Sequence, residues 1–142
     1  MNNYDLPYYM TIMAIQDTLQ NYYEPKSNFG YNYLKNRCME TSKLTSLILP
    51  ELIQQAGFIN GQWHAWNLDT QNNLIIDLSL WQFQDLKISP NNYLFPKDST
   101  LHKFNKKALW EQKTNFKLNA GNIEEKIEQL LKNYDEIKDG YI

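Results

Sequence analysis

The stretch that decides the fold is Gln62-Trp63-His64-Ala65-Trp66-Asn67-Leu68, followed after a polar segment by Leu74-Ile75-Ile76-Asp77-Leu78. In an extended chain, successive side chains point to opposite faces, so His64 shares its face with Trp66. We expect strands over residues 62–68 and 74–80, joined by the polar residues 69–73. The preceding Asn60-Gly61 is a strong signal for a tight hairpin turn.

Helices are expected on both sides of these strands. The first begins near Asp5-Leu6-Pro7 and ends at Glu24-Pro25, and the second begins around Asn36 or Arg37 and ends at Gly57. Pro50 either kinks this second helix or restarts it. The last helix begins at Asn122, with a capping-box glutamate three residues later. The order predicts an α+β fold, with helices packed on a mostly antiparallel sheet.

Composition indicates an ordinary folded chain. The sequence has 142 residues, 42% of them hydrophobic, and a net charge near −2, which predicts a single domain over residues 1–142. The lysines form no basic run, so nucleic acid is not an expected partner. No segment has the roughly 20 apolar residues of a membrane span, and the first residues lack the pattern of a signal peptide. We expect a cytoplasmic protein, or one secreted without an N-terminal signal peptide.

Cys38 is the only cysteine, so no internal disulfide can form. It lies at the expected start of the second helix, where free backbone N–H groups and the helix dipole favour a thiolate. Arg37 adds a neighbouring positive charge. These conditions make a thiol nucleophilic at neutral pH. The alternative is that Cys38 is only a small buried residue, as most free cysteines are.

The two strands offer Cys38 a base and an acid. If Thr70-Gln71 is the centre of the turn, His64 lies directly across from Asp77, within reach of a hydrogen bond. A register slip of one residue would place the two side chains on opposite faces. An Asp on one imidazole nitrogen fixes the tautomer and leaves the other nitrogen to face a thiol. The alternatives are a core histidine and a carboxylate that caps a strand end.

These motifs resemble those of a known superfamily. Cys38-Met39-Glu40-Thr41-Ser42-Lys43-Leu44 on a helix, His64-Ala65-Trp66 on a strand and Ile76-Asp77-Leu78-Ser79 on the next are similar to the transglutaminase-like branch of the papain-like superfamily. Trp81-Gln82-Phe83 resembles the Gln-Phe ending found near the acid of such domains. The resemblance covers about residues 30 to 85. That branch includes peptidases, protein glutamine deamidases and acyltransferases, among them bacterial effector and toxin domains.

The resemblance implies a role for each residue that matches. Cys38 would be the nucleophile, His64 the general base and acid, and Asp77 the residue that orients His64. Many members have an oxyanion-hole Gln about six residues before the cysteine, where this chain has Asn32. An Asn there would donate to the oxyanion with the backbone N–H of Cys38. Apart from the resemblance, Trp66 shares the face of His64, where it would either shield the His–Asp pair from water or serve as a core aromatic residue.

Other sites are expected to be absent. The chain has no Cys-x-x-Cys or His-x-x-x-His pair, so we expect no metal, although Cys38, His64 and Asp77 have suitable ligand chemistry. It has no phosphate loop or dinucleotide fingerprint, so we expect no cofactor. His102 has no partner in the sequence and is expected at the surface.

The sequence therefore predicts a cysteine-dependent amidase or acyltransferase that acts on a peptide or protein. Whether it is a peptidase, a glutamine deamidase or a transglutaminase depends on the acceptor, and the sequence does not decide between them. Its oligomeric state is not predicted. The competing hypothesis is a catalytically inert domain, for instance an inhibitor, that binds a protein through its many Tyr and Trp residues.

Overall fold

The computed structural model of the protein describes residues 3–26, 33–118 and 120–141. Its helices are α1 (Tyr9–Tyr23), α2 (Cys38–Ile48), α3 (Lys106–Leu118) and α4 (Ala120–Ile137), and its strands are β1 (Leu52–Ile59), β2 (Gln62–Asp69), β3 (Leu74–Ile76) and β4 (Leu94–Pro96). Short 3-10 turns, among them Leu80–Gln82, lie between these elements. The α+β class expected from the sequence is confirmed.

The strands form one antiparallel sheet in the order β1-β2-β3-β4. A two-residue turn joins β1 to β2, with φ of 51° at Asn60 and 76° at Gly61. This confirms the predicted hairpin, because Asn and Gly tolerate the left-handed backbone that such a turn requires.

The turn between β2 and β3 corrects the predicted register. Asp69 pairs with Leu74, and Asn67 pairs with Ile76, so the turn is four residues long and His64 does not lie directly across from Asp77. The carboxylate of Asp69 accepts hydrogen bonds from the backbone N–H groups of Gln71 and Asn72, at 3.0 and 3.1 Å, and this moves the turn along the chain. Because the shift is two residues, His64 and Asp77 remain on the same face.

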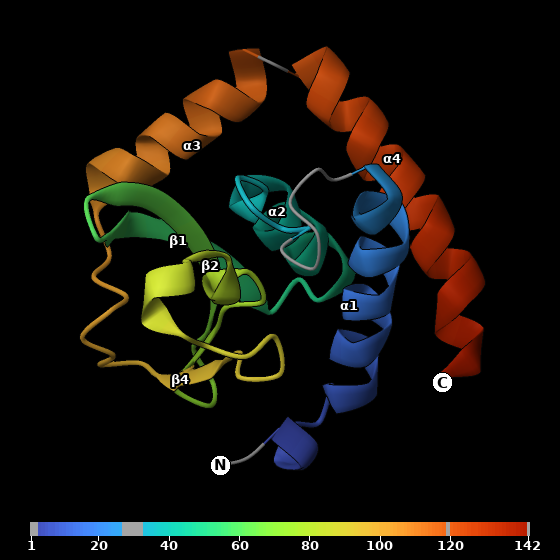
Figure 1. The fold of residues 1–142 in the computed structure, drawn as a ribbon, viewed down its shortest axis with the longest axis horizontal. Helices are drawn as coiled ribbons and strands as arrows, with labels where there is room; N and C mark the ends of the chain where they lie inside the picture. The colour runs from blue at the N-terminus through green and yellow to red at the C-terminus, as the bar shows by residue number, and fades with distance from the viewer. Residues whose placement is uncertain (1–2, 27–32, 119, 142) are drawn as a thin grey trace.

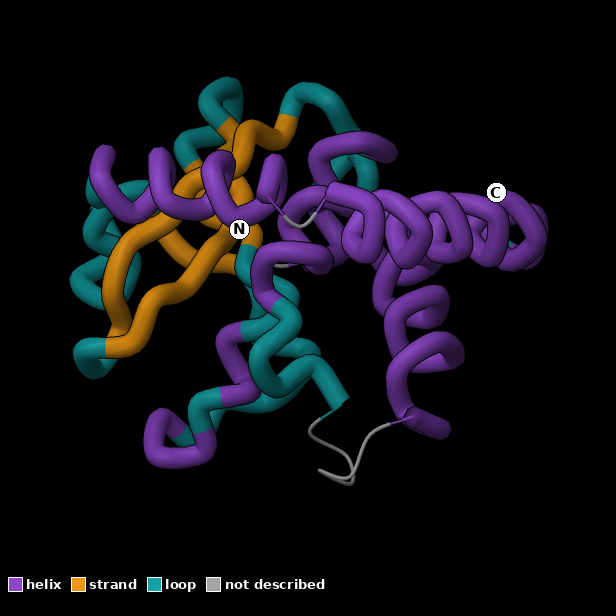
Figure 2. Tube along the Cα trace, turned by 90° about the horizontal axis from the view of Figure 1, so that it is seen from above, coloured by secondary structure: helices purple, strands orange, loops and turns teal. Residues whose placement is uncertain are grey.

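Helix α2 lies between the sheet and the pair formed by α1 and α4 (Figure 1). Seen from above, the strands gather at one end of the molecule and α3 crosses them (Figure 2). The main core joins α1, α2, α4 and the adjoining strands through buried aliphatic side chains, including Ile12, Ile15, Leu19, Leu44, Leu52, Ile76, Ile127 and Leu130. This packing fixes the start of α2 against β2.

The strand expected over residues 74–80 ends at Ile76, and other predictions about the elements are also wrong. The second helix ends at Ile48, because Pro50 lacks the N–H that would continue it, and Gly57 lies in β1. The last helix begins at Ala120, before Asn122. Helix α3 was not predicted at all. Among the described residues, no helix combines the length and the apolar character needed to cross a membrane.

Candidate active site

Cys38 is the first residue of α2, as the sequence predicts. Its side chain is 6% exposed, and the first turn of the helix begins with the hydrogen bond from the N–H of Thr41 to the carbonyl of Arg37. The Arg37 guanidinium lies 4.2 Å from the centre of the Tyr23 ring, and its Nη1 lies 2.6 Å from the carbonyl oxygen of Tyr33. The Arg37 charge is therefore directed toward α1, while the helix N-terminus remains beside the thiol.

His64 and Asp77 form the central pair of the site. Nε2 of His64 lies 2.8 Å from Oδ2 of Asp77, and both side chains are fully buried. Asp77 follows the end of β3, and its backbone N–H donates to the carbonyl of Tyr93 at 2.8 Å. The other oxygen of Asp77 accepts the backbone N–H of Ser79 at 3.2 Å. The predicted His–Asp contact is present, reached diagonally across the sheet.

Cys38 completes this contact at the edge of β2. Its thiol lies near enough to the His64 imidazole to favour the protonated ring, yet it also belongs to a small apolar cluster with Ala65, the next residue of β2. Neighbouring residues of a strand point to opposite faces, so Cys38 must lie beside the strand edge. That edge is open because β3 pairs only with residues 67–69 of β2.

The pair is held in its charged form. Burial alone would lower the pKa of His64, but the Asp77 charge, its hydrogen bond and the contact with Cys38 raise that pKa to about 10. Burial would likewise raise the pKa of Asp77, but the His64 charge and hydrogen bonds from His102 and His64 hold it well below its usual range. At neutral pH the site therefore contains an imidazolium and a carboxylate.

Gln82 is a site residue whose role was not predicted. Its Nε2 lies 3.2 Å from Nδ1 of His64, on the ring side opposite Asp77. Its Oε1 accepts the backbone N–H of Asn36 at 2.9 Å. Gln82 thus links the loop before Cys38 to the imidazole. The Trp81-Gln82-Phe83 motif was the only sequence signal that pointed to it.

His102 corrects the expectation of a surface residue. It is 4% exposed, and its Nε2 lies 2.7 Å from the same oxygen of Asp77 that contacts His64. Sequence reasoning missed it because a loop between β4 and α3 brings it to the site, and no strand pattern marks that loop. Asp77 therefore has two imidazole partners.

Aromatic rings enclose the His–Asp pair. Trp66 is 1% exposed, and its ring centre lies 6.1 Å from that of His64. The Phe83 ring meets His64 edge-on at 5.0 Å. Trp66 also donates its Nε1–H to Oε1 of Gln55 at 3.1 Å, which fixes the indole. Trp66 therefore lies on the same face as His64, as the sequence predicts, and is buried beside it.

A cavity of about 200 Å³ gives access to Cys38. Its lining comes from the start of α2, the start of β2 and the Gln82 turn, and comprises Asn36, Cys38, Met39, Glu40, Gln62, Trp63, Gln82 and Phe83. The predicted oxyanion residue, Asn32, lies outside the described residues. Within the described part of the chain, no three His, Cys, Asp or Glu side chains are arranged to hold a metal ion.

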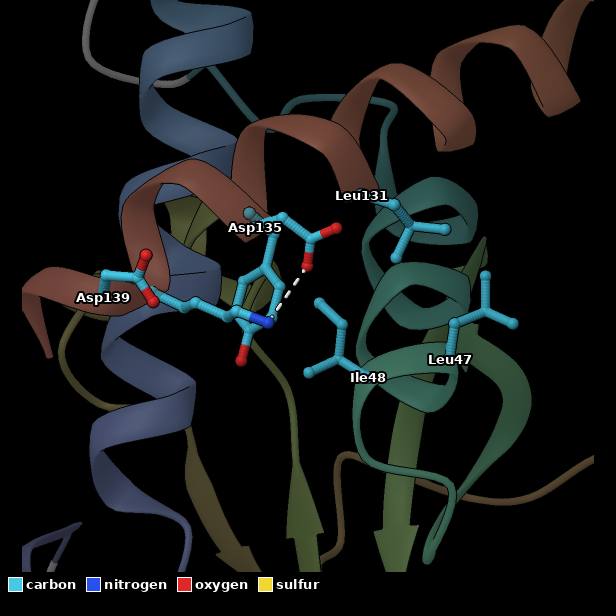
Figure 3. A pocket seen from close by; sticks show the side chains of 7 residues that line it. Leu47, Ile48, Leu131, Asp135 and Asp139 are labelled. Carbon is cyan, nitrogen blue, oxygen red and sulfur yellow. Dashed lines mark ion pairs between the residues drawn. The ribbon is translucent and has the colours of Figure 1, made fainter. Parts of the chain in front are cut away.

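A larger groove, of about 580 Å³, lies at the opposite end of α2 (Figure 3). Leu47 and Ile48 form one wall, and Leu131 and the last turns of α4 form the other. The charged groups there include Lys138 and Asp135, which pair at 3.3 Å. No cysteine or histidine is among the residues that line this groove.

Comparison of the chain with protein-family models, with curated proteins and with solved structures finds no match.

Proposed function

We propose that this protein is a cysteine-dependent amide hydrolase or acyltransferase with a papain-like fold of the transglutaminase-like branch. The observation that carries the proposal is the convergence of Cys38, His64 and Asp77. The thiol lies at a helix N-terminus beside an imidazole, and Nε2 of that imidazole is 2.8 Å from a buried carboxylate. A nucleophile, a base and an orienting acid in this order are what thiol catalysis requires.

In the proposed reaction, the sulfur of Cys38 attacks the carbonyl carbon of an amide as the thiolate. The tetrahedral intermediate collapses when the C–N bond breaks, and His64 gives its proton to the leaving amine or ammonia. An acyl-thioester on Cys38 remains. His64, now neutral, takes a proton from water or from an amine, which attacks the thioester and releases the thiolate, so that the starting thiolate and imidazolium are restored.

The high pKa of His64 suits the first half of this cycle. At about 10, it keeps the ring protonated at neutral pH, so a proton is available for the leaving group. Asp77 holds the ring through Nε2, and Gln82 lies on the Nδ1 side. Asp77 would stabilise the imidazolium by its charge without taking the proton.

The lining of the cavity supports a peptide or protein substrate. Trp63 and Phe83 offer apolar surface, and the side chain of Gln62 offers an amide group that pairs with a peptide backbone. Hydrolysis of a main-chain amide would be proteolysis. Attack on a glutamine side chain would give deamidation with water, or transamidation with an amine.

The rate of Cys38 alkylation by iodoacetamide tests the proposal without a known substrate. Because the chain has a single cysteine, the reagent reports on Cys38 alone. We expect the native protein to react faster than the urea-unfolded chain at mildly acidic pH, where an ordinary thiol is protonated. His64→Ala should remove this advantage. A native rate no higher than that of the unfolded chain would favour the inert binding domain.

The reaction type needs a second assay. Incubation with an unfolded glutamine-rich protein separates the outcomes, since proteolysis creates new amino termini, deamidation releases ammonia, and transamidation incorporates a labelled amine. Each product should disappear in Cys38→Ala, which removes the sulfur while keeping a good helix former.

A further inference from the structure

His102 is a buried titratable residue that the proposed reaction does not use. It lies between β4 and α3, and its ring packs against two aromatic residues of the sheet. The ring centres lie 5.0 Å from Trp66 and 4.9 Å from Phe95. A phenylalanine would fill this space equally well, so the packing alone does not explain an imidazole there.

The polar contacts of His102 account for both ring nitrogens. Nε2 lies 2.7 Å from Oδ2 of Asp77, and Nδ1 lies 2.9 Å from Oγ of Ser99. A carboxylate only accepts hydrogen bonds, so Nε2 must carry a proton. Ser99 is fixed in turn, since its backbone N–H donates to the carbonyl of Pro96 at 2.9 Å and its Oγ accepts the N–H of Leu101 at 3.3 Å. A tight turn thus sets the orientation of the ring.

The backbone after His102 is also held in place. The N–H of Asn105 donates to the carbonyl of Ala56 at 2.9 Å, and Phe104 forms a bridge with Gly57 of β1. His102 is therefore fixed from both sides. Nε2 of His64 lies 2.8 Å from the same oxygen of Asp77, so the carboxylate lies between two imidazoles.

We propose that His102 is a positioning residue of this site, holding the Asp77 carboxylate so that its Oδ2 faces Nε2 of His64. This inference rests on the proposed function of Cys38, His64 and Asp77. Without the second donor, a buried carboxylate would be held only by His64 and by Ser79 at its other oxygen. Its rotation would then misalign the imidazole from the thiol.

A matched pair of variants tests the proposal. His102→Phe keeps an aromatic ring between Trp66 and Phe95 but cannot donate to Asp77. His102→Gln can donate an amide N–H to the same oxygen. We expect His102→Phe to slow the alkylation of Cys38 by iodoacetamide about tenfold at neutral pH, the scale of one charge-assisted hydrogen bond. His102→Gln should restore most of the rate.

The pH profile of the alkylation separates positioning from packing. The groups facing His102 that titrate are Asp77 and, through it, His64, so the profile of His102→Phe should change shape and that of His102→Gln should resemble the native one. The urea denaturation midpoint of each variant verifies folding. If His102→Phe does not fold, Ser99→Ala takes its place, because it frees the ring while leaving the imidazole present.

The two hypotheses fail in different ways. If His64→Ala leaves the alkylation of Cys38 unchanged, the proposed function is wrong, and the role of His102 falls with it. If His64→Ala slows alkylation but a folded His102→Phe, or Ser99→Ala in its place, behaves like the native protein, only the inference about His102 is wrong. An equal loss of alkylation rate in His102→Phe and His102→Gln would also overturn it, because a side chain that donates to Asp77 would then have no advantage.

Discussion

The amide nitrogen of Gln82 lies 3.2 Å from Nδ1 of His64, while its amide oxygen accepts the backbone N–H of Asn36 at 2.9 Å. One side chain therefore ties the loop before Cys38 to the ring that Cys38 contacts. Two fixed ends leave the amide a single orientation. Gln82 should control how precisely the ring and the thiol are aligned.

Gln82→Leu should lower both stability and thiol reactivity. The variant keeps a similar volume but removes both amide groups, so the part-buried N–H of Asn36 loses its acceptor and the buried Nδ1 of His64 loses its partner. We expect the free energy of unfolding to fall by about 1 to 3 kcal/mol, and Cys38 to react more slowly with iodoacetamide. The control is Gln16→Leu, whose amide makes an exposed contact with Pro90, and which should change stability by less than about 0.5 kcal/mol. Equal effects in both variants would exclude a special role for Gln82.

If the proposed reaction is correct, substitution of His64 and of Asp77 should have graded effects on turnover. His64→Ala should abolish it, because no proton reaches the leaving amine. Asp77→Asn should reduce turnover by orders of magnitude but leave measurable activity, since the amide does not stabilise the imidazolium. Asp85→Asn, which alters an exposed contact with Asn60, serves as the control. Full activity in Asp77→Asn would mean that another group orients His64.

The stability of the protein should depend on pH through the same pair. The pKa of His64 is raised to about 10 from about 6.5 in the unfolded chain. The stability contributed by its protonation is complete below about pH 6.5 and is lost as the pH rises toward 10. The pKa of Asp77 is lowered, so its contribution is complete above about pH 4 and is lost as the pH falls through its folded value.

Urea denaturation across pH measures this dependence. The free energy of unfolding of the native protein should be highest between about pH 4 and about pH 6.5, where both contributions are complete. Asp77→Asn should lose most of the decline on the alkaline side, because His64 then lacks the charge that raises its pKa. Parallel curves for the two proteins would contradict the assignment of the charges.

Gly57→Ala tests how the chain that carries His102 is docked. A methyl group on Gly57 would lie 2.2 Å from the carbonyl oxygen of Lys103 and 2.8 Å from Cη2 of Trp66. Because neither contact is sterically possible, Lys103 must move. His102, the preceding residue, would then be displaced from its contact with Asp77. We expect a loss of about 1 to 3 kcal/mol in the free energy of unfolding, with slower alkylation of Cys38. Gly140→Ala, which meets nothing within 4 Å, should fold normally.

The sequence predicts the local pieces of this site better than their assembly. The start of a helix at Cys38 and the strand that carries His64 follow from patterns of a few residues. The register between β2 and β3 was misjudged by two residues, because Asp69 caps a longer turn. The His–Asp contact was still correct, since a shift of two keeps both side chains on one face.

What the sequence could not predict depends on contacts between distant segments. His102 lies 25 residues after Asp77, in a loop without periodicity, so only the folded chain places it beside the carboxylate. Gly57 was predicted to end a helix. In the structure it lies in β1, where the absence of a side chain lets the backbone of Lys103 approach closely. Helix α3 has a weak apolar stripe and an exposed Trp110, which gave no helical pattern to recognise.

The position of His102 has a consequence for biosynthesis. A ribosome releases the chain from its N-terminus, so Cys38 emerges well before His64, Asp77, Gln82 and, last of these, His102. Until His102 and the residues that anchor it on β1 have emerged, the cluster lacks its final member. A nascent chain would thus carry a thiol beside an incomplete cluster, and the proposed reactivity of Cys38 would be complete only after His102 and its anchoring residues have emerged.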